Sequence, residues 1–542
     1  MRKGLYLCVA LGVCASCSSD QNKHQAAVGP GGGGASAGAS ASAAGTDAAG
    51  GSVSNGGRSQ AHAGSTGKAG ASSGGTSGID TGAGGDGSGG VATTGGTKTG
   101  TAGAGGGKFG MGGVGGVAGT QILVDGSKVL QTMDGFGAAI NPHSWDDGAV
   151  KPALDYLDTM GVRLWRVSYE MMDWEATNDD ADPANYNWTS YDAIFSSPQF
   201  EELWSTIAYL NSKGYGPTIM LDFMGRVPDW MGGASLADGM EDELAETIVA
   251  AAYYGRVTRK LDFGMLEPLN ETDWDGIEGP QVDATEFADV MNKIAARIDA
   301  VDGLKSLRLV GPDTAMSGAA TGSYIPGMMG KAAVMAHVDT FTIHQYSASS
   351  AGLMDMLAKS KYPTKHGWVS ETSSIYDAWA QVTEGVNAVI LWDGYDSVYE
   401  HAKLAGRGST APNDAGNQPA ALAYSNGKYT RRNEYYFWQQ LCAFVEPGAQ
   451  RIYAKSTVDG VQILAFNHPV TGQLTVVGTN NNGSEEKLSI GLQFLASLPA
   501  SFSVYATNQD QSFKKLADAP VVDGKTSITA PYNSIFTLTA KP

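Results

Sequence analysis

Two glutamates each close an apolar segment of the sequence, where a charged side chain is costly to bury unless it has a role. Glu271 follows a Leu-Asn pair, and Glu371 follows a Val-Ser pair. Paired carboxyl groups suit glycosidic bond cleavage, because one protonates the departing oxygen while the other attacks the anomeric carbon or activates water. We therefore take Glu271 and Glu371 as the candidate catalytic pair. The alternative is that each forms an ordinary ion pair.

Six further side chains are candidates for binding a substrate beside this pair. The acid must keep its proton near neutral pH, whereas the other carboxylate must stay ionised and needs a cationic or hydrogen-bonding neighbour. Arg166 and the Tyr346 phenol suit that second requirement, and indole rings offer flat faces for sugar rings. A tryptophan at a strand end also packs commonly in a core, and His344 could serve only as a structural hydrogen-bonding group. The candidates are Asn270, Arg166, His344, Tyr346, Trp392 and Trp230.

The elements that must position these residues begin near residue 133, where short apolar segments alternate with amphipathic patterns. Eight strands alternating with helices predict a parallel (β/α)8 barrel, the TIM barrel, with an open doubly wound sheet as the alternative. The candidate residues fall at C-terminal strand ends, where barrel enzymes carry their sites. The predicted strands are 135–140, 162–169, 218–223, 265–270, 307–311, 340–345, 368–370 and 388–392.

Five segments carry the clearest helical pattern, with apolar residues spaced three and four apart. Asp283 precedes one of them and is expected to cap it, with Glu286 completing a capping box. The predicted helices are 153–160, 201–212, 241–260, 285–300 and 374–385.

The pattern changes again after about residue 450, where short strands follow one another without long helices. This predicts a C-terminal antiparallel β-sandwich. It holds none of the eleven tryptophans, which favours a structural role, although its tyrosines leave glycan binding open. The expected organisation is an N-terminal strand joining the sandwich at 121–132, a catalytic barrel at 133–448 and the sandwich at 449–542. Its predicted strands are 461–466, 473–479, 488–492, 502–507 and 528–537.

The first 120 residues are predicted to form no folded domain. Arg2 and Lys3 precede a short apolar run, as in a signal peptide, here residues 1–17. Residues 13–17 (VCASC) resemble a bacterial lipoprotein box with Cys17 as the lipid acceptor; cleavage without lipidation is the alternative. Residues 18–120 are rich in Gly, Ser and Ala and predict a disordered linker. We expect an exported protein, anchored at the cell envelope or secreted.

Composition narrows the possible partners. The chain has 36 basic and 55 acidic side chains and a formal net charge of −19, which argues against nucleic acid or anionic lipid as the main partner. The eight histidines show no ligand spacing, so we expect no metal and no cofactor. The folded region has no nucleophile elbow, which disfavours an esterase. Cys442, in an apolar stretch, is expected in the core. We expect a monomer that contacts a membrane only through its lipid.

Several segments resemble glycoside hydrolase family 30, within the clan A retaining glycosidases. The Asn270-Glu271 pair, and Glu371 one hundred residues later, resemble the acid/base and nucleophile positions of that clan. The resemblance covers about residues 121–542. The more specific segments are 134–139 (DGFGAA), similar to the first-strand motif, 228–231 (PDWM), similar to the loop after the third strand, 435–452, similar to the last barrel helix and its exit, and 531–537 (PYNSIFT), similar to the closing strand.

The resemblance implies a role for each site residue. Glu271 would be the general acid/base and Glu371 the nucleophile. Asn270 would hydrogen-bond the sugar 2-hydroxyl group, Tyr346 would bond to Glu371, and Arg166 would keep Glu371 ionised.

The resemblance also implies the reaction, the retaining cleavage of β-glycosidic bonds in a polysaccharide or oligosaccharide. Trp392 would form the floor of the subsite for the reacting sugar. Two segments depart from the family pattern, residues 222–226 (DFMGR) and the long polar stretch 393–432, and both border the expected substrate groove. Sugar identity, linkage and endo or exo action therefore stay open. The alternative function is a non-catalytic surface glycan-binding protein on a degenerate barrel.

Overall fold

The computed structural model describes residues 119–541, apart from 172–173, 275, 277, 347–348, 393, 396–420 and 426. The predicted signal peptide, the predicted lipid acceptor Cys17 and nearly all of the predicted linker lie outside the described residues, as does much of the segment 393–432. All described residues fall within one compact unit, Thr101–Pro542. Where the chain is described, no helix has both the length and the apolar character needed to cross a bilayer.

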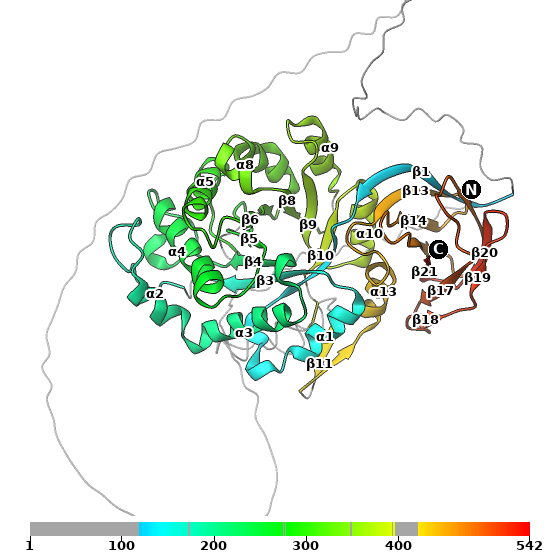
Figure 1. Cartoon of the computed structure of the whole chain (residues 1–542), viewed down its shortest axis with the longest axis horizontal. Coiled ribbons are helices and arrows are strands. Elements are labelled where there is room, and N and C mark those ends of the chain that lie inside the picture. The colour runs from blue at the N-terminus through cyan, green and yellow to red at the C-terminus, as the bar shows by residue number, and fades with distance from the viewer. Residues whose placement is uncertain are drawn as a thin grey trace, which may run out of the picture. The chain divides into compact units, whose positions relative to one another are not determined.

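Nine parallel strands form the first sheet and close into the predicted barrel (Figure 1). In chain order they are β2 (Gly135–Ile140), β3 (Leu164–Glu170), β4 (Ile219–Met224), β5 (Met265–Glu267), β6 (Arg308–Leu309), β7 (Pro312–Thr314), β8 (Thr340–His344), β9 (His366–Thr372) and β10 (Ala388–Leu391). Their order in the sheet is β6-β5-β4-β3-β2-β10-β9-β8-β7. The two end strands are consecutive in the chain, and a bridge from Leu309 to Val338, just before β8, closes the ring. β6 and β7 thus act as one broken strand, and the barrel has the predicted eight positions.

The barrel strands are apolar because both of their faces are covered. Every residue of β2, β4, β8 and β10 is buried. A small core inside the ring gathers side chains from strands or strand ends all around it, namely Leu164, Met220, Met265, Val310, Trp368, Ala388 and Ile390. This interior cluster fills the barrel, so the polar site has to lie at its mouth.

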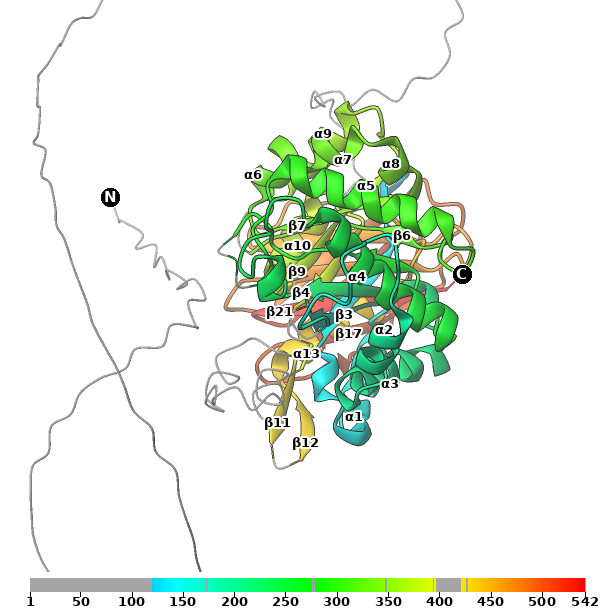
Figure 2. The same cartoon turned by 90° about the vertical axis from the view of Figure 1, so that its left-hand side faces the viewer.

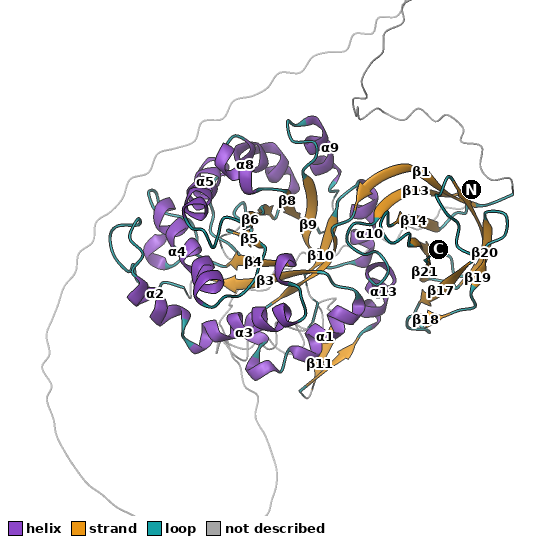
Figure 3. Cartoon of the chain, viewed as in Figure 1, coloured by secondary structure: helices purple, strands orange, loops and turns teal. Residues whose placement is uncertain are grey.

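Helices surround the barrel strands (Figure 3). Those matching predicted helices are α1 (Lys151–Met160), α3 (Pro198–Ser212), α4 (Glu241–Tyr253), α5 (Ala284–Ala300) and α10 (Ile375–Glu384). The others are α2 (Trp188–Phe195), α6 (Ser317–Ala319), α7 (Ile325–Met329), α8 (Ala332–His337), α9 (Ala351–Lys359) and α13 (Asn433–Cys442). α4 is shorter than predicted because the chain passes into a π-helix at Tyr254–Thr258.

The predicted cap of α5 is confirmed. The Asp283 carboxylate accepts hydrogen bonds from the backbone N–H groups of Thr285 and Glu286. The Glu286 carboxylate accepts in turn from the Asp283 N–H, which completes the capping box.

A second sheet contains the N-terminal strand and the C-terminal region. Its strands are β1 (Ile122–Thr132), β13 (Gln450–Ser456), β14 (Val461–Asn467), β15 (Leu474–Asn480), β16 (Glu486–Gln493), β17 (Ser501–Thr507), β18 (Lys514–Lys515), β19 (Ala519–Pro520), β20 (Lys525–Ala530) and β21 (Ser534–Ala540). The order is β18-β17-β21-β15-β14-β13-β1-β16-β20, with β19 paired to β17. Side chains near both ends of this order, such as Val504 and Ile490, share one core, so the sheet folds over itself as a sandwich.

Two predictions for this sheet are wrong in detail. The sheet is not wholly antiparallel, because β1 enters between β13 and β16 and runs parallel to β16. The predicted strand 528–537 is two strands, β20 and β21. Pro531 lacks the N–H that would continue the ladder, and Asn533 adopts a left-handed φ of 43°, so the chain turns between them.

Helix α13 joins the barrel to the sandwich. Gln440 donates a 2.9 Å hydrogen bond from Nε2 to Thr507 Oγ1 and accepts a 2.6 Å bond at its carbonyl from Thr537. The same helix carries Cys442, which is buried as predicted. A two-stranded hairpin, β11 (Leu422–Ser425) and β12 (Lys428–Arg431), lies beside α13 (Figure 2).

Candidate active site

Glu371 lies one residue before the end of β9 and is 6% exposed. Its Oε2 accepts a 2.8 Å hydrogen bond from Arg166 Nη1. Its Oε1 accepts a hydrogen bond from the Tyr346 hydroxyl group. Both carboxylate oxygens therefore have a donor, and the group is held in one orientation at the barrel mouth.

Glu271 lies four residues beyond β5, not at the end of a strand as the sequence suggested. Pro268 ends β5 because it has no N–H for the ladder. Glu271 itself has a left-handed φ of 42°, and its N–H donates to the Asp313 carbonyl at 2.9 Å. Its side chain is 12% exposed. The loop backbone, rather than the strand, thus orients this carboxyl group.

The two glutamates meet at His344, the last residue of β8. His344 Nδ1 lies 2.8 Å from Glu271 Oε1 and 3.5 Å from Glu371 Oε2. One oxygen of each carboxyl group and a ring nitrogen of His344 all lie within 4.8 Å of one another. The structure therefore brings together the two residues that the sequence marked as a pair.

Arg166, on β3, is the buried cation of the site. Besides Glu371, it binds both carboxylate oxygens of Glu267, through Nε at 3.0 Å and Nη2 at 2.8 Å, and Nη2 lies 3.1 Å from Asp222 Oδ2. Burial by itself lowers the pKa of a guanidinium group, but the charges of Asp222, Glu267 and Glu371 raise the pKa of Arg166 well above its usual value. Arg166 therefore stays charged.

Three buried carboxyl groups near Arg166 are site residues that the sequence analysis missed. Burial, opposed by Arg166, raises the pKa of Asp222 to about 6 and that of Glu267 to about 7. Burial and the neighbouring Glu267 raise the pKa of Asp313 to about 7. One signal was available: Glu267 interrupts the apolar run of β5, where an acidic side chain needs a partner.

The His344 ring is held in the neutral form. Burial is the main cause that lowers the pKa of His344. The positive charge of Arg166 lowers this pKa further, while the negative charges of Glu371 and Asp313 oppose the change. A neutral ring can donate from Nδ1 to an ionised Glu271 or accept from a protonated Glu271. This hydrogen bond can therefore be kept in both protonation states of the glutamate.

Asn270 and Trp392 also lie at this cluster. Asn270 Oδ1 accepts from Arg166 Nη2 at 2.6 Å, and its Nδ2 donates to the Glu278 carbonyl at 2.9 Å. The Trp392 ring centroid lies 5.9 Å from the guanidinium carbon of Arg166, within the range of a cation–π contact. Both residues therefore lie beside Arg166.

Trp230 is not joined to this cluster by the contacts it makes. It lies in the 3-10 helix Asp229–Met231, and its Nε1 donates to the Glu175 carbonyl at 2.7 Å. A different tryptophan follows Glu271 closely in the chain: the backbone N–H of Trp274 donates to the Glu271 carbonyl at 3.0 Å, and Trp274 is 38% exposed. Trp274 therefore offers the more accessible indole at this mouth.

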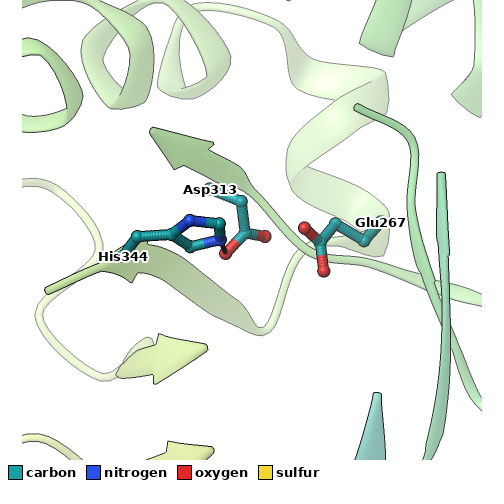
Figure 4. Close-up of side chains that lie close together, drawn as sticks. All are labelled: Glu267, Asp313 and His344. Atoms are coloured by element: carbon teal, nitrogen blue, oxygen red, sulfur yellow. Dashed lines mark ion pairs between the residues drawn. The ribbon is translucent and has the colours of Figure 1, made fainter. Parts of the chain in front are cut away.

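Two groups of side chains bring metal-ligand atoms within 4.8 Å of one another, although the sequence showed no ligand spacing. One is Glu271, His344 and Glu371, and the other is Glu267, Asp313 and His344 (Figure 4). Arg166 Nη2 already lies 2.8 Å from Glu267 and 3.4 Å from His344 Nε2. The guanidinium group supplies the positive charge that a metal would bring, so we interpret both groups as an ion-pair network.

Comparisons with known proteins agree on the fold. No family model matches the sequence, and no curated protein matches it. Among solved structures, an endoxylanase of glycoside hydrolase family 30 from Clostridium papyrosolvens is similar over 78% of this chain and 100% of its own, at 17% identity and a TM-score of 0.59. SrfJ from Salmonella typhimurium is similar over 78% of this chain and 93% of its own, at 16% identity and a TM-score of 0.57.

An endo-β-1,6-glucanase is similar over 78% of this chain and 95% of its own, at 17% identity and a TM-score of 0.55. These likenesses show a common fold, a barrel with an attached β-domain.

Proposed function

We propose that this protein is a retaining glycoside hydrolase, similar to family 30 enzymes, that cleaves β-glycosidic bonds by double displacement. The observation that carries the proposal is the pairing of Glu271 and Glu371, which have carboxyl oxygens within 4.8 Å of each other. Retaining enzymes place their carboxyl groups about 5–5.5 Å apart, whereas inverting enzymes need about 6.5–9.5 Å to admit a water molecule. The shorter separation supports direct attack by a carboxylate.

In the first step, a Glu371 oxygen attacks the anomeric carbon as the bond to the leaving oxygen breaks. Glu271 gives its proton to that oxygen, and a glycosyl ester remains on Glu371. The hydrogen bond from His344 to Glu271 fits this proton transfer, because a neutral ring serves both protonation states of the acid.

In the second step, Glu271 takes a proton from water, which attacks the same carbon and releases Glu371 as a carboxylate. Arg166 and Tyr346 bind separate oxygens of Glu371, so they favour its departure as an anion. Glu267 binds Arg166 from the opposite side and keeps the guanidinium group in place while the charge on Glu371 disappears and returns.

The substrate class is a polysaccharide or oligosaccharide. The mouth of the site carries exposed aromatic groups, with Tyr346 41% exposed and Trp274 38% exposed, and these suit the apolar faces of sugar rings. Trp392 beside Arg166 is in place to contact the sugar that reacts at Glu371. Proteins with a similar fold include a xylanase and a β-1,6-glucanase, so both xylan and β-1,6-glucan should be tested as substrates.

The decisive experiment screens the purified protein against β-linked polysaccharides and aryl glycosides and follows the anomeric form of the first product by NMR. We expect product that keeps the substrate configuration, and a Glu371→Gln variant that folds normally but has no turnover. A 2-fluoro glycoside should label Glu371 covalently, located by peptide mass spectrometry. Inverted product, or an active Glu371→Gln variant, would refute the mechanism. Glycan binding without hydrolysis by the unmodified protein would instead support the glycan-binding alternative.

We also propose that the protein is exported and lipid-anchored through Cys17. The support is the charged, apolar and small-residue pattern of residues 1–17. Detergent phase partition of the full chain tests this, with Cys17→Ser expected to move the protein into the aqueous phase and Cys14→Ser expected to change nothing. Equal partition of both variants would refute the anchor.

A further inference from the structure

Two carboxyl groups near the candidate catalytic pair exchange no proton and form no bond in the reaction proposed above. Glu267 on β5 and Asp313 on β7 are both fully buried. They point toward each other next to His344 (Figure 4), and each is a hydrogen-bonding partner of the other. Two carboxyl groups can bond in this way when one of them carries a proton.

The charges around this pair favour a retained proton. Arg166 is the fixed cation, and it faces carboxyl groups from three strands, Asp222 on β4, Glu267 on β5 and Glu371 on β9, with Asp313 close behind. His344 adds no charge when neutral. Four ionised carboxylates against one guanidinium group would leave uncompensated charge in a dry interior, which is strongly unfavourable.

The hydrogen bonds of Asp313 show how the pair is held. The Thr342 hydroxyl donates to Asp313 Oδ2 at 2.6 Å, and the Ser370 hydroxyl bonds to Oδ1. Ser370 also reaches the Ile343 carbonyl at 3.2 Å, so it can turn its proton away when Asp313 is protonated. On the other side, Glu267 is fixed by two bonds from Arg166.

We propose that Glu267 and Asp313 share one proton near neutral pH, and that this proton controls how strongly Arg166 binds Glu371. The shared proton rests on the placement of these groups and on the charges around them; its catalytic effect rests on the function proposed above. Glu267 and Asp313 are positioning residues, since they act through Arg166. When the proton is present, the pair has one negative charge, and the hydrogen bonds of Arg166 are shared between Glu267 and Glu371. When the proton leaves, the second negative charge draws Arg166 toward the pair and weakens its hold on Glu371.

Infrared difference spectroscopy of the full chain tests the shared proton without needing a substrate. Since the pKa values of Glu267 and Asp313 are both raised to about 7, we expect the carbonyl band of a protonated carboxyl group to fade through neutral pH. The part of this change that belongs to the pair should be missing in Glu267→Gln. Glu246→Gln is the matched control, because Glu246 is another buried glutamate whose pKa is raised to about 9 by burial and by Asp179. The Glu246→Gln variant should lack the band that fades at higher pH and keep the band that fades near neutral pH.

A second variant tests the direction of the effect and covers the case in which Glu267→Gln does not fold. Thr342→Val removes a hydrogen bond that stabilises the charged form of Asp313, so the fading of the band should move to higher pH. A neutral-pH band change that is identical in Glu267→Gln and the parent, or one that moves to lower pH in Thr342→Val, would overturn the proposal.

The catalytic effect is tested by the pH dependence of kcat/KM on an aryl glycoside. We expect the activity of the unmodified enzyme to fall over the pH range in which the infrared band fades. The pH profile of Glu267→Gln should lack this ionisation, whereas that of Glu246→Gln should keep it. An unchanged profile in Glu267→Gln would overturn the catalytic effect. Failure to hydrolyse any substrate would refute the proposed function but leave the infrared result to decide on the proton. Stoichiometric binding of Mn²⁺, seen by electron paramagnetic resonance and lost in Glu267→Gln, would overturn the proposal by showing a metal at this pair.

Discussion

Arg166 Nη1 lies 2.8 Å from Glu371 Oε2, although 205 residues separate them in the sequence. They come from β3 and β9, which are separated in the sheet by β2 and β10. The contact therefore spans the barrel mouth, and the buried guanidinium group links the candidate nucleophile to Glu267 on the other side. The positions of these side chains are therefore fixed by contacts between strands that are not neighbours in the sheet.

Replacing Arg166 with lysine should lower kcat/KM by about 100-fold or more, because one ammonium group cannot bind Glu371 and both oxygens of Glu267 together. Arg166→Met should also lower the free energy of unfolding, because removing the partner of buried charges destabilises a fold by about 3–5 kcal/mol. Denaturant unfolding at pH 7 and at pH 5 checks this. The loss should be smaller at pH 5, where the carboxyl groups hold more protons. A lysine variant with normal kcat/KM would refute the shared-cation role.

Tyr346→Phe removes the hydroxyl group that binds Glu371 Oε1 but keeps the aromatic ring. A hydrogen bond to a charged group is worth about 1.5–3 kcal/mol, so we expect a fall in kcat of about 10- to 100-fold. Single-turnover kinetics should show the loss in release of the glycosyl ester, where the anion re-forms. Tyr376→Phe is the control, because that tyrosine is exposed on α10. A loss confined to KM would mean that Tyr346 contacts only the substrate.

Glu271→Ala should slow substrates that need a proton on the leaving oxygen far more than aryl glycosides with activated leaving groups. Azide should restore turnover on the activated substrates by attacking the ester in place of water. Rates for a series of leaving groups check both points. Equal losses across the series, without rescue by azide, would argue against Glu271 as the acid/base.

Glu246 should make the protein less stable as the pH rises. It is 1% exposed on α4, and burial and Asp179 raise its pKa to about 9, against about 4.3 in an unfolded chain. Between these values the unfolded chain binds fewer protons than the folded one, so stability falls with increasing pH until the folded group ionises.

Glu246→Gln removes this slope. Its gain in free energy of unfolding over the parent should therefore grow from pH 5 to pH 9, as measured by urea unfolding. Glu485→Gln, at an exposed position of the sandwich, should show no such trend. A Glu246→Gln variant that is uniformly destabilised would contradict the raised pKa.

The sequence predicted the framework of the site well, because its signals are local. Alternating apolar strands and amphipathic helices indicate a barrel, and the strand ends then locate His344 and Glu371, whereas Arg166 lies within β3. The capping of α5 was also predictable, since Asp283 and Glu286 are three residues apart.

Other features depend on contacts that no local pattern encodes. Three buried carboxyl groups form one network because the strands that carry them meet at Arg166. Their spacing along the chain does not indicate that they will meet. They are Asp222, Glu267 and Asp313. Trp230 lies in a segment that resembles a family motif, yet its indole bonds to a carbonyl away from the pair. The position of Glu271 in a loop follows from Pro268, which stops β5 early.

The place of β1 between β13 and β16 has a mechanical consequence for a chain held by its N-terminus. A pull on that end reaches the sandwich first, at Gln121 and Ile122, and runs along two ladders of hydrogen bonds that are loaded in shear. The chain segment from β1 into the barrel, at Met133, is loaded directly only after β1 has separated from both neighbours. The sandwich would thus yield to such a load before the barrel that carries the candidate site.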